Sequence, residues 1–501
     1  MLQLEKLTIT HQKDLQDLVR DLDLVLNPGE KLAIIGEEGT GKSSLIKAIV
    51  APQLLSSYAQ LSGTITNRFH QRGYLPQTLE VETLQLTVID FLYGDLDYGL
   101  FDFNLFYRYA DQFGLDLDTF EAQNQTLSSL SGGERLKVQL LKILATDPDL
   151  LILDEPSSDL DIETLQWLEN FIQRSEKAIL FISHDESLLA RAATAILHLE
   201  LLKKRTEPRA TFYRGSYDQY RQERREKFEH QLQVAKKERE EHTKKMERHH
   251  RIHQSVEHVL RHTHDSTAGR LLAKKMKNVL SQEKRLKKEA ENLTEIPQDM
   301  DAIQLFFSEI KPLPASKTIL SWEHKTLPTG QIINLQIRGQ DKLVITGKNG
   351  IGKTRLLKLL LMDLRVRTDL SVGYMPQHYE EEFEAQSTPL SFLTSVADEE
   401  KVRTLLASLK FTRQEVVHSL HDLSGGQKAK LFLARMVLAG NNVLVLDEPT
   451  RHFSPTSQPL IRQLLREYPG AIISVSHDRC FIEEVAALHY QLDEEKLVRT
   501  R

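Results

Sequence analysis

The sequence predicts two α/β domains, each built on a buried parallel sheet, with a long antiparallel helical hairpin between them. The chain has 501 residues, which exceeds what one hydrophobic core usually supports. A series of short motifs occurs twice in the same order, and a charged segment poor in glycine and proline separates the two copies. We therefore expect a first domain over residues 1–215, a hairpin over 216–300 and a second domain over 301–501.

Five landmarks are repeated along the chain. They are Gly36 and Gly347, Gln77 and Gln377, Ser131 and Ser424, Asp154 and Asp447, and His184 and His477. The members of the last three pairs are each 293 residues apart, so an internal duplication is the simplest explanation. The glycine-to-glutamine stretch is 41 residues in the first copy and 30 in the second, and neither length holds a further domain.

Composition and charge exclude several classes of protein. Hydrophobic residues make up 40% and charged residues 27% of the chain, which is ordinary for a folded globular protein. A net charge of -6 argues against nucleic-acid binding by the whole surface. One cysteine, Cys480, cannot form an internal disulfide and fits a reducing compartment. No apolar run approaches a membrane span and no targeting segment is evident, so we expect a cytoplasmic protein without membrane contact.

The segment between the copies has the composition of long helices. Lys, Arg, Glu and Gln dominate it from about Tyr217 to Glu291. Its sparse apolar residues are spaced for a narrow seam between two helices: Phe228, Leu232, Ala235, Leu272, Met276, Val279 and Leu286. Small and turn-forming residues cluster between His262 and Gly269, where we expect the tip. Residues 221–300 carry 20 Lys and Arg against 14 Asp and Glu, so the hairpin is locally basic. On composition alone a solvated coiled coil explains these charges better than an RNA-binding arm.

Each copy contains a glycine-rich loop that follows an apolar strand and precedes a helix. The loops are Gly36–Ser43 and Gly347–Thr354, and both have the pattern G-x4-G-K followed by Ser or Thr. Backbone N–H groups of such a loop bind phosphate, the lysine offsets the charge of the β and γ phosphates, and the hydroxyl is placed to coordinate Mg²⁺. The predicted phosphate-binding residues are Gly36, Gly39, Gly41, Lys42, Ser43, Gly347, Gly350, Gly352, Lys353 and Thr354.

Further along each copy, a continuous apolar strand ends in two carboxylates. Asp154 and Asp447 are expected to support the Mg²⁺ shell, and Glu155 and Glu448 to polarise the attacking water. Continuous apolar strands fit a parallel sheet that is buried on both faces. An acidic pair after a strand is a weak signal alone, and it gains its meaning from the phosphate loop upstream.

Each copy also has a Leu-Ser-Gly-Gly turn that opens a helix. The backbone N–H groups and positive dipole end of such a helix suit a γ phosphate. Each copy already has a phosphate loop, so a second phosphate site implies that ATP is shared between the two domains. The predicted contacts come from Ser131, Gly132, Gly133, Ser424, Gly425 and Gly426.

With these motifs, the chain resembles the ATP-binding cassette (ABC) superfamily, and the predicted fold becomes two P-loop ATP-binding cassettes joined by the hairpin. The resemblance implies that Lys42 works opposite Ser424, and Lys353 opposite Ser131, in one monomer with intramolecular cassette pairing. It also identifies Gln77 and Gln377 as glutamine-loop residues that sense Mg²⁺ and water. It identifies His184 and His477 as switch histidines that contact the γ phosphate.

Two cassettes in one chain with a charged helical linker resemble the ABC-F family, which acts on ribosomes. The entry to the linker, Tyr213–Tyr220, is similar to that of the family. The family hairpin enters the ribosomal E site, and its tip approaches the P-site tRNA and the peptidyl-transferase centre within the large-subunit RNA. The translation factors of the family often carry an arm in the first cassette. Without room for one, the chain looks more like the Lsa and Vga type of antibiotic-resistance protein.

Other functions stay open at this point. A housekeeping ABC-F translation factor, a tandem energy subunit of a membrane transporter and a chromosome-maintenance ATPase all share the core motifs. The transporter subunit would not need about 75 helical residues as a spacer, and the coiled coils of chromosome ATPases are normally far longer. An ATPase that displaces a drug or adjusts peptidyl-tRNA on the ribosome is therefore the leading interpretation.

The chain departs from the family after the Asp-Glu-Pro motif of each copy. The family usually continues Asp-Glu-Pro with Thr-Asn-His-Leu-Asp, but the two copies read Ser157–Asp161 and Thr450–Ser454 at this position. Ser454 replaces the aspartate that normally communicates between cassettes, which predicts two hydrolytic sites with unequal rates. The adenine-stacking residues stay undecided between His11 in the first copy and Trp322 or His324 in the second.

Overall fold

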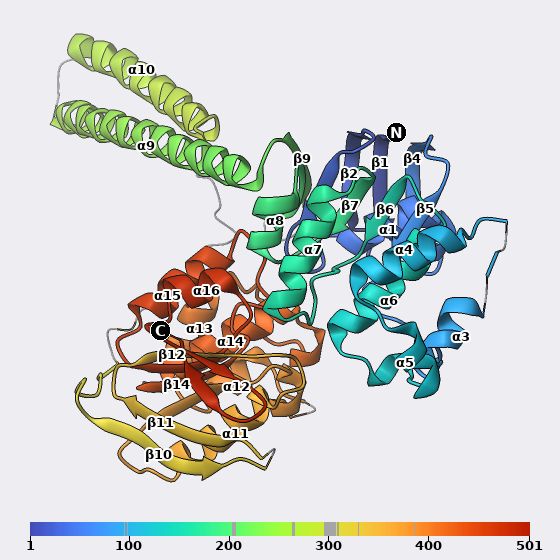
Figure 1. The fold of residues 1–501 in the computed structure, drawn as a ribbon. Coiled ribbons are helices and arrows are strands. Elements are labelled where there is room, and N and C mark those ends of the chain that lie inside the picture. Colours follow the sequence, from blue (N-terminus) through green and yellow to red (C-terminus); the bar gives the residue numbers. More distant parts are fainter. Residues whose placement is uncertain are drawn as a thin grey trace. The chain divides into compact units, whose positions relative to one another are not determined.

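The computed structural model describes residues 1–94, 96–97, 99–202, 207–262, 266–294, 307, 310–328, 330–384 and 386–500. Contacts divide the chain into two compact units. Met1–Tyr217 and Met300–Arg501 form the first unit, with both α/β domains, and Asp218–Asp299 form the second. The predicted fold class, two α/β domains and a helical hairpin, is confirmed (Figure 1). The predicted boundary between residues 300 and 301 lies outside the described residues.

A mostly parallel sheet forms the centre of the first domain. Its strand order is β5-β6-β7-β3-β8-β9, and every neighbouring pair is parallel except β8 with β9. The strands are β3 (Lys31–Ile35), β5 (Arg72–Leu75), β6 (Leu150–Leu153), β7 (Ala178–Ile182), β8 (Ala195–Leu202) and β9 (Glu207–Arg214). Every residue of β3, β6 and β7 is buried, as the apolar runs of a sheet covered on both faces predict.

The second domain repeats this sheet strand for strand. Its order is β13-β14-β15-β12-β16-β17, with β16 and β17 as the antiparallel pair. The strands are β12 (Lys342–Thr346), β13 (Val372–Met375), β14 (Val443–Asp447), β15 (Ala471–Val475), β16 (Leu488–Leu492) and β17 (Leu497–Arg499). The repeated topology agrees with the duplication seen in the sequence.

The two copies differ in their antiparallel sheets. The first domain has three such strands in the order β2-β1-β4, and the second has the pair β10-β11. They are β1 (Leu2–His11), β2 (Asp17–Leu26), β4 (Ala59–Asn67), β10 (Thr318–Thr326) and β11 (Ile332–Arg338). β4 lies between the phosphate loop and Gln77. It therefore accounts for the longer glycine-to-glutamine stretch of the first copy.

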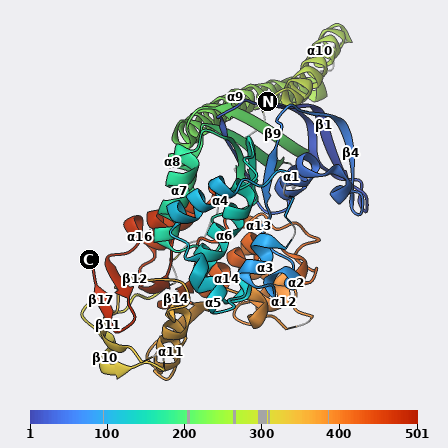
Figure 2. The same cartoon turned by 45° about the vertical axis from the view of Figure 1, so that its right-hand side comes forward.

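Helices pack on these sheets and carry the loops of the candidate site. In the first domain they are α1 (Lys42–Val50), α2 (Val81–Leu84), α3 (Val88–Tyr93), α4 (Phe103–Phe113), α5 (Leu117–Ala122), α6 (Gly132–Leu144), α7 (Ile162–Arg174) and α8 (Glu186–Ala192). In the second they are α11 (Lys353–Arg365), α12 (Pro389–Thr394), α13 (Glu399–Ser408), α14 (Gly425–Leu438), α15 (Gln458–Glu467) and α16 (Arg479–Glu484). Apolar residues of α1 and β3 share one buried cluster, and those of α11 and β12 share another. Figure 2 shows α3 to α6 grouped together, away from β1 and β4.

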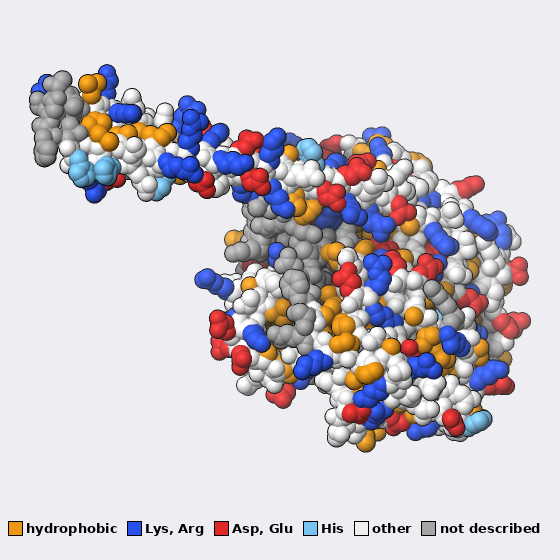
Figure 3. All heavy atoms as spheres, turned by 90° about the vertical axis from the view of Figure 1, so that its left-hand side faces the viewer, with side chains coloured by type: hydrophobic (Ala, Val, Ile, Leu, Met, Phe, Trp, Pro, Cys, Tyr) orange, Lys and Arg blue, Asp and Glu red, His pale blue; other side chains and the backbone are white. Residues whose placement is uncertain are grey.

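The hairpin consists of α9 (Tyr217–His262) and α10 (Ser266–Glu291). The tip was predicted between His262 and Gly269; residues 266–269 belong to α10 instead, and residues 263–265 lie outside the described residues. Nε2 of His242 lies 2.9 Å from the carbonyl oxygen of Leu286, and Nε2 of His249 lies 2.8 Å from that of Val279. The partner number falls as the number on α9 rises, so the helices are antiparallel. Figure 3 shows Lys and Arg side chains along the hairpin. Among the described residues, every helix is too short or too polar to cross a membrane.

The seam of the hairpin has the predicted spacing but an unpredicted composition. Ala235, Val256 and Val279 are buried, and the other predicted seam residues are half-buried. His242 and His249 lie in the same row as Ala235 and Val256, at seven-residue intervals. Because the imidazoles bond to carbonyls of α10, they fix the register in the way that a polar residue does in a coiled coil. The seam predicted from the sequence included neither histidine.

Replacing His249 with alanine should destabilise the hairpin by about 1–2 kcal/mol, because an interhelical hydrogen bond and a buried ring are lost. Amide hydrogen exchange along α10 measures this as faster exchange around Val279. His250→Ala is the matched control, since His250 is exposed and bonds only to Gln254 on its own helix among the contacts of the described residues. Equal exchange in the two variants would contradict a register role for His249.

Candidate functional site

The two phosphate loops follow β3 and β12 and lead directly into α1 and α11. Their glycines have positive φ values in the same pattern. The values are 151°, 80° and 89° at Gly36, Gly39 and Gly41, and 150°, 81° and 104° at Gly347, Gly350 and Gly352. Side chains other than glycine rarely adopt this region. The two loops therefore share one backbone conformation that their glycines permit.

Each loop lysine folds back over its own loop. Nζ of Lys42 donates to the carbonyl oxygens of Gly36 and Glu37, both at 2.8 Å. Nζ of Lys353 donates to those of Gly347 and Lys348, at 2.8 and 2.9 Å. Burial lowers the pKa of both lysines. A phosphate anion at the loop would compensate this burial of charge.

Asp154 and Asp447 lie at the ends of β6 and β14, and 3% and 1% of their surfaces are exposed. Oδ1 of Asp154 and Oδ2 of Asp447 are buried without a hydrogen-bond partner among the described residues. Burial and the charge of Glu155 raise the pKa of Asp154 to about 6, although a hydrogen bond from Ser43 opposes this. Burial also raises the pKa of Asp447, against a hydrogen bond from Thr354. Unpartnered carboxylate oxygens beside a hydroxyl fit a divalent cation such as Mg²⁺.

The two glutamates after these aspartates have a strained backbone. Glu155 has a φ of 51° and Glu448 a φ of 52°, in the left-handed region that glycine favours. Such a conformation costs about 1–3 kcal/mol and persists where the surrounding structure holds it. Because the same conformation is present in both copies, the fold fixes the direction of both carboxylates.

Around Glu155, three side chains hold the carboxylate. Oε1 lies 3.5 Å from Nε2 of His184, and Oε2 accepts hydrogen bonds from Gln77 at 2.9 Å and Ser158 at 3.3 Å. Burial alone would raise the pKa of Glu155, but the hydrogen bond and charge of His184, with Lys42, lower it to about 2. The carboxylate is therefore ionised and oriented.

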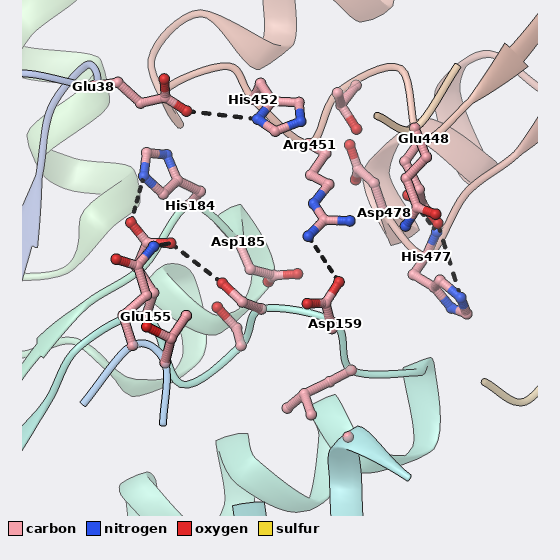
Figure 4. A pocket seen from close by; sticks show the side chains of 18 of the residues that line it. Glu38, Glu155, Asp159, His184, Asp185, Glu448, Arg451, His452, His477 and Asp478 are labelled. Carbon is pink, nitrogen blue, oxygen red and sulfur yellow. Dashed lines mark hydrogen bonds and ion pairs between the residues drawn. The ribbon is translucent and has the colours of Figure 1, made fainter. Parts of the chain in front are cut away.

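Around Glu448, the contacts are looser. Oε1 lies 3.8 Å from Nε2 of His477, and Oε2 accepts a hydrogen bond of 3.3 Å from the backbone N–H of His477. Burial and Asp447 raise the pKa of Glu448 to about 8. Burial and Lys353 lower the pKa of His477 to about 4. The pKa values of the two glutamates therefore shift in opposite directions, although both cassettes contain the same pair of glutamate and histidine (Figure 4).

The Leu-Ser-Gly-Gly turns begin α6 and α14. The Ser131 hydroxyl accepts a hydrogen bond from the backbone N–H of Glu134, and the Ser424 hydroxyl accepts one from Gln427, both at 3.3 Å. A Cβ on Gly133 would lie 2.6 Å from Thr164, so that position requires glycine. Gly132, Gly425 and Gly426 are similarly crowded by the loops that follow β6 and β14.

One cavity of about 1220 Å³ joins the two domains. Lys42, Glu155 and His184 of the first domain line it together with Lys353 and Glu448 of the second. Gln77, Gln377, His477, Ser43, Thr354, Asp447, Gly132 and the second and third glycines of each phosphate loop also line it. The other predicted residues stand outside this lining: Gly36, Gly347, Asp154, Ser131, Gly133, Ser424, Gly425 and Gly426.

Each phosphate loop contacts the other domain. Glu38 of the first loop accepts a hydrogen bond of 2.5 Å from the backbone N–H of Gly425 at the start of α14. Asn349 of the second loop donates a hydrogen bond of 2.6 Å to the carbonyl oxygen of Asp159. Arg451 also pairs with the carboxylate of Asp159 at 2.7 Å. The two domains thus meet at both phosphate loops: the first loop contacts the start of α14, and the second contacts the loop that follows β6.

Comparison with known proteins agrees with this geometry. The sequence model of the ABC transporter family matches residues 19–158 and 330–451, one match in each domain. The chain belongs to the ABC transporter family. Its two domains are ABC ATPase cassettes, which bind and hydrolyse ATP.

Full-length relatives narrow the family. The putative ATP-binding protein YdiF of Bacillus subtilis is 28% identical over 527 residues, which cover 94% of this chain and 76% of the relative. ABC transporter F family member 5 of Arabidopsis thaliana is 27% identical over 93% of this chain and 72% of its own. The ATP-binding protein Uup of Haemophilus influenzae is 28% identical over 94% and 76%. The chain is thus a tandem ABC ATPase of the ABC-F family.

Two solved structures share the fold. The RNase-L Inhibitor has a TM-score of 0.62 at 17% identity, and covers 99% of this chain and 91% of its own. The archaeal ribosome recycling factor aABCE1, solved in complex with the ribosomal stalk protein aP1, has a TM-score of 0.62 at 16% identity over 99% and 90%. Both likenesses in fold extend over nearly the whole chain.

The departures from the ABC pattern have a structural explanation. Ser454 is buried and bonds within its own cassette, to Ser457 at 2.8 Å and to Thr456 at 3.1 Å. Gln458 makes the contact with the other cassette instead, since its side-chain amide donates a hydrogen bond of 2.9 Å to the carbonyl oxygen of His184. In the first cassette, Asp161 caps α7 and its charge acts on His477 and Lys353 across the interface. The second cassette therefore contacts the first through a neutral amide, Gln458, whereas the first cassette acts on the second through a charge, Asp161.

A second group of contacts ties the two switch-histidine loops together. Arg462 of α15 is 1% exposed and pairs with Glu186 of the first cassette at 2.6 Å. It also lies 3.2 Å from Glu484 and 3.9 Å from Asp478. The hydroxyl of Tyr217 donates to Glu186 at 3.4 Å. The network is buried at Arg462 and Glu186, and Glu186 and Asp478 also line the cavity.

The candidates for adenine stacking separate in the structure. His11 lines the cavity, with Tyr58, which the sequence had not suggested. Trp322 is 6% exposed, lies in a hydrophobic core and donates a hydrogen bond of 2.9 Å to Asp363. His324 is not part of the lining. Neither of the two candidates in the second cassette, Trp322 and His324, therefore lines the described cavity.

Sequence reasoning missed Glu38, Gln458 and Arg462. For Glu38 a signal existed, because it is an acid inside a phosphate loop and the matching position of the second loop is Asn349. Gln458 and Arg462 carry no signal of this kind, since polar residues on a short amphipathic helix normally face solvent.

Proposed function

We propose that this ABC-F ATPase binds two ATP molecules between its cassettes and, while ATP is bound, occupies the ribosomal E site. There the α9–α10 hairpin would act on the P-site tRNA and the peptidyl-transferase centre of the large-subunit RNA. Hydrolysis would release the protein. The contact of each phosphate loop with the other cassette carries this proposal, because ATP bound at either loop would then lie between the two cassettes.

Each proposed ATP site is built from residues of both cassettes of one chain. Lys42 would bind phosphate opposite Ser424, and Lys353 opposite Ser131. Glu155 and Glu448 would orient and polarise the attacking water, and His184 and His477 would contact the γ phosphate.

Two sets of residues would hold Mg²⁺, which supplies positive charge to the phosphates when bound. They are Ser43, Asp154 and Gln77 in the first cassette, and Thr354, Asp447 and Gln377 in the second. In the structure Gln77 bonds to Glu155 rather than to Asp154, so it would have to turn toward the ion.

The ribosomal target is supported by two observations. One of the two structural neighbours described above is a ribosome recycling factor. The hairpin is locally basic within an acidic chain, which suits contact with RNA phosphates. A cytoplasmic monomer fits both. Ribosome protection against an antibiotic, as in the Lsa and Vga branch, is our more specific proposal, since β4 and not an arm fills the extra length of the first cassette.

The experiment is sedimentation of ribosomes with the Glu155→Gln, Glu448→Gln double variant in the presence of ATP. Blocked hydrolysis should hold the protein on the ribosome, so we expect it to migrate with ribosomal fractions, and drug susceptibility of cells that express the parent chain would be tested next. A variant with residues 246–282 replaced by a short glycine-serine turn is the control. It keeps the His242–Leu286 contact and should lose ribosome binding. Co-purification with a membrane permease and no ribosomes would favour a transporter subunit instead.

A further inference from the structure

The two phosphate loops differ at their third position. Glu38 occupies it in the first loop and Asn349 in the second, at the same offset of 311 residues that relates the loops. Both side chains reach the other cassette. The chain thus provides its own comparison of a charged and a neutral residue at one position in two matching sites.

Glu38 occupies the anion-binding end of α14. Its Oε2 accepts the 2.5 Å hydrogen bond from Gly425, the first residue of that helix. Its Oε1 lies 3.5 Å from Nδ1 of His452 (Figure 4). Burial would raise the pKa of Glu38, but the bonds from His452 and Gly425 hold it below the ordinary value. The N-terminus of a helix is where an anion such as the γ phosphate binds, and here a carboxylate has that place.

The second site is arranged differently. Asn349 is neutral and bonds to the carbonyl oxygen of Asp159, not to the start of α6. The N-terminus of α6 has its carboxylate from its own helix, because Glu134 accepts from the backbone N–H of Ser131 at 2.9 Å. At α14 the corresponding residue is the neutral Gln427, and the carboxylate comes from the other cassette.

We propose that Glu38 and His452 form a latch that holds the γ-phosphate position of the site between Lys42 and Ser424, so that this site binds ATP more weakly than the other and fills second. ATP must displace the carboxylate from Gly425, because two anions cannot share one helix N-terminus. ADP lacks the γ phosphate and does not compete with Glu38. The latch therefore lowers the affinity for ATP relative to that for ADP at this site and not at the other.

This inference rests on the proposed pairing of Lys42 with Ser424, and does not depend on the ribosome. Its test is nucleotide binding by the purified full-length chain in the Glu155→Gln, Glu448→Gln background, with Lys353→Ala added so that the first site reports. We expect Glu38→Asn to tighten Mg²⁺–ATP binding on the order of tenfold and to leave ADP binding within about twofold. Glu38→Gln, which keeps the side-chain length, should act in the same direction.

Two further variants sharpen the test. Asn349→Glu should weaken ATP binding at the second site, because it introduces a carboxylate there. This variant is measured in a chain with Lys42→Ala in place of Lys353→Ala, so that the second site is the one whose binding is observed. Glu176→Gln removes one negative charge from an exposed position of the first cassette and should change neither affinity. A similar gain in Glu176→Gln would show a general charge effect and overturn the latch.

Unchanged ATP affinity in both Glu38 variants, or equal gains for ATP and ADP, would also overturn the latch while leaving the two-site function intact. Failure of every Lys353→Ala chain to bind ATP, while the Lys42→Ala chains bind it, would remove the first site itself. That outcome would overturn the pairing in the proposed function along with the latch.

Discussion

Replacing both Glu155 and Glu448 with glutamine should lower steady-state ATP hydrolysis by roughly 10²–10⁴-fold, the range that a positioned general base contributes. Glutamine has nearly the same shape as glutamate, so phosphate loops and lysines keep their geometry, but an amide cannot take a proton from water. ATP binding should be retained. Phosphate release at saturating ATP measures the loss, and binding of labelled ATP supplies the control.

The single variants should differ from each other. Glu155 is held by His184, Gln77 and Ser158, whereas among the described residues the Glu448 carboxylate contacts only His477, with Oε1 3.8 Å from Nε2 of the imidazole. A better-oriented carboxylate supports a faster reaction. We therefore expect Glu155→Gln to remove more of the turnover than Glu448→Gln when both sites are saturated with ATP. Equal turnover in the two single variants would contradict the asymmetry.

Much of the fold followed from local patterns. The apolar runs before Asp154 and Asp447 predicted buried parallel strands, because only a sheet covered on both faces accepts such runs. The glycines of each phosphate loop predicted its chemistry, since they mark a backbone that other residues disfavour. The composition between Tyr217 and Glu291 predicted two helices, which the structure contains.

The contacts between the cassettes could not be predicted in this way. Glu38 and Gly425 are 387 residues apart, and only the family resemblance, which places Lys42 opposite Ser424, indicated that their segments would meet. Periodicity reports which face of one element is apolar, but it does not report what that face meets. The same limit hid His249, a polar residue on a helix whose polar residues mostly face water, although it is buried against Val279.

Arg462 is the strongest example of that limit, and its replacement should cause a large loss of stability. A charged side chain is almost never fully buried unless it is paired. Here the guanidinium is 1% exposed and faces Glu186, Asp478 and Glu484. Burial would lower the pKa of Arg462, but Glu186 and Asp478 raise it, so the cation persists. Its charge holds carboxylates from both cassettes close together.

Arg462→Met should therefore destabilise the cassette pair by about 3–5 kcal/mol, because breaking a buried ion pair leaves its partner charges uncompensated. Thermal unfolding would record this as a melting temperature lower by about 6–20 °C. Arg466→Met is the matched control, since Arg466 lies one turn further along α15 and is exposed. Adding Glu186→Gln to Arg462→Met should recover part of the loss, because one uncompensated charge is removed. If Arg462→Met melted like Arg466→Met, the buried network would contribute no stability to the pairing of the cassettes.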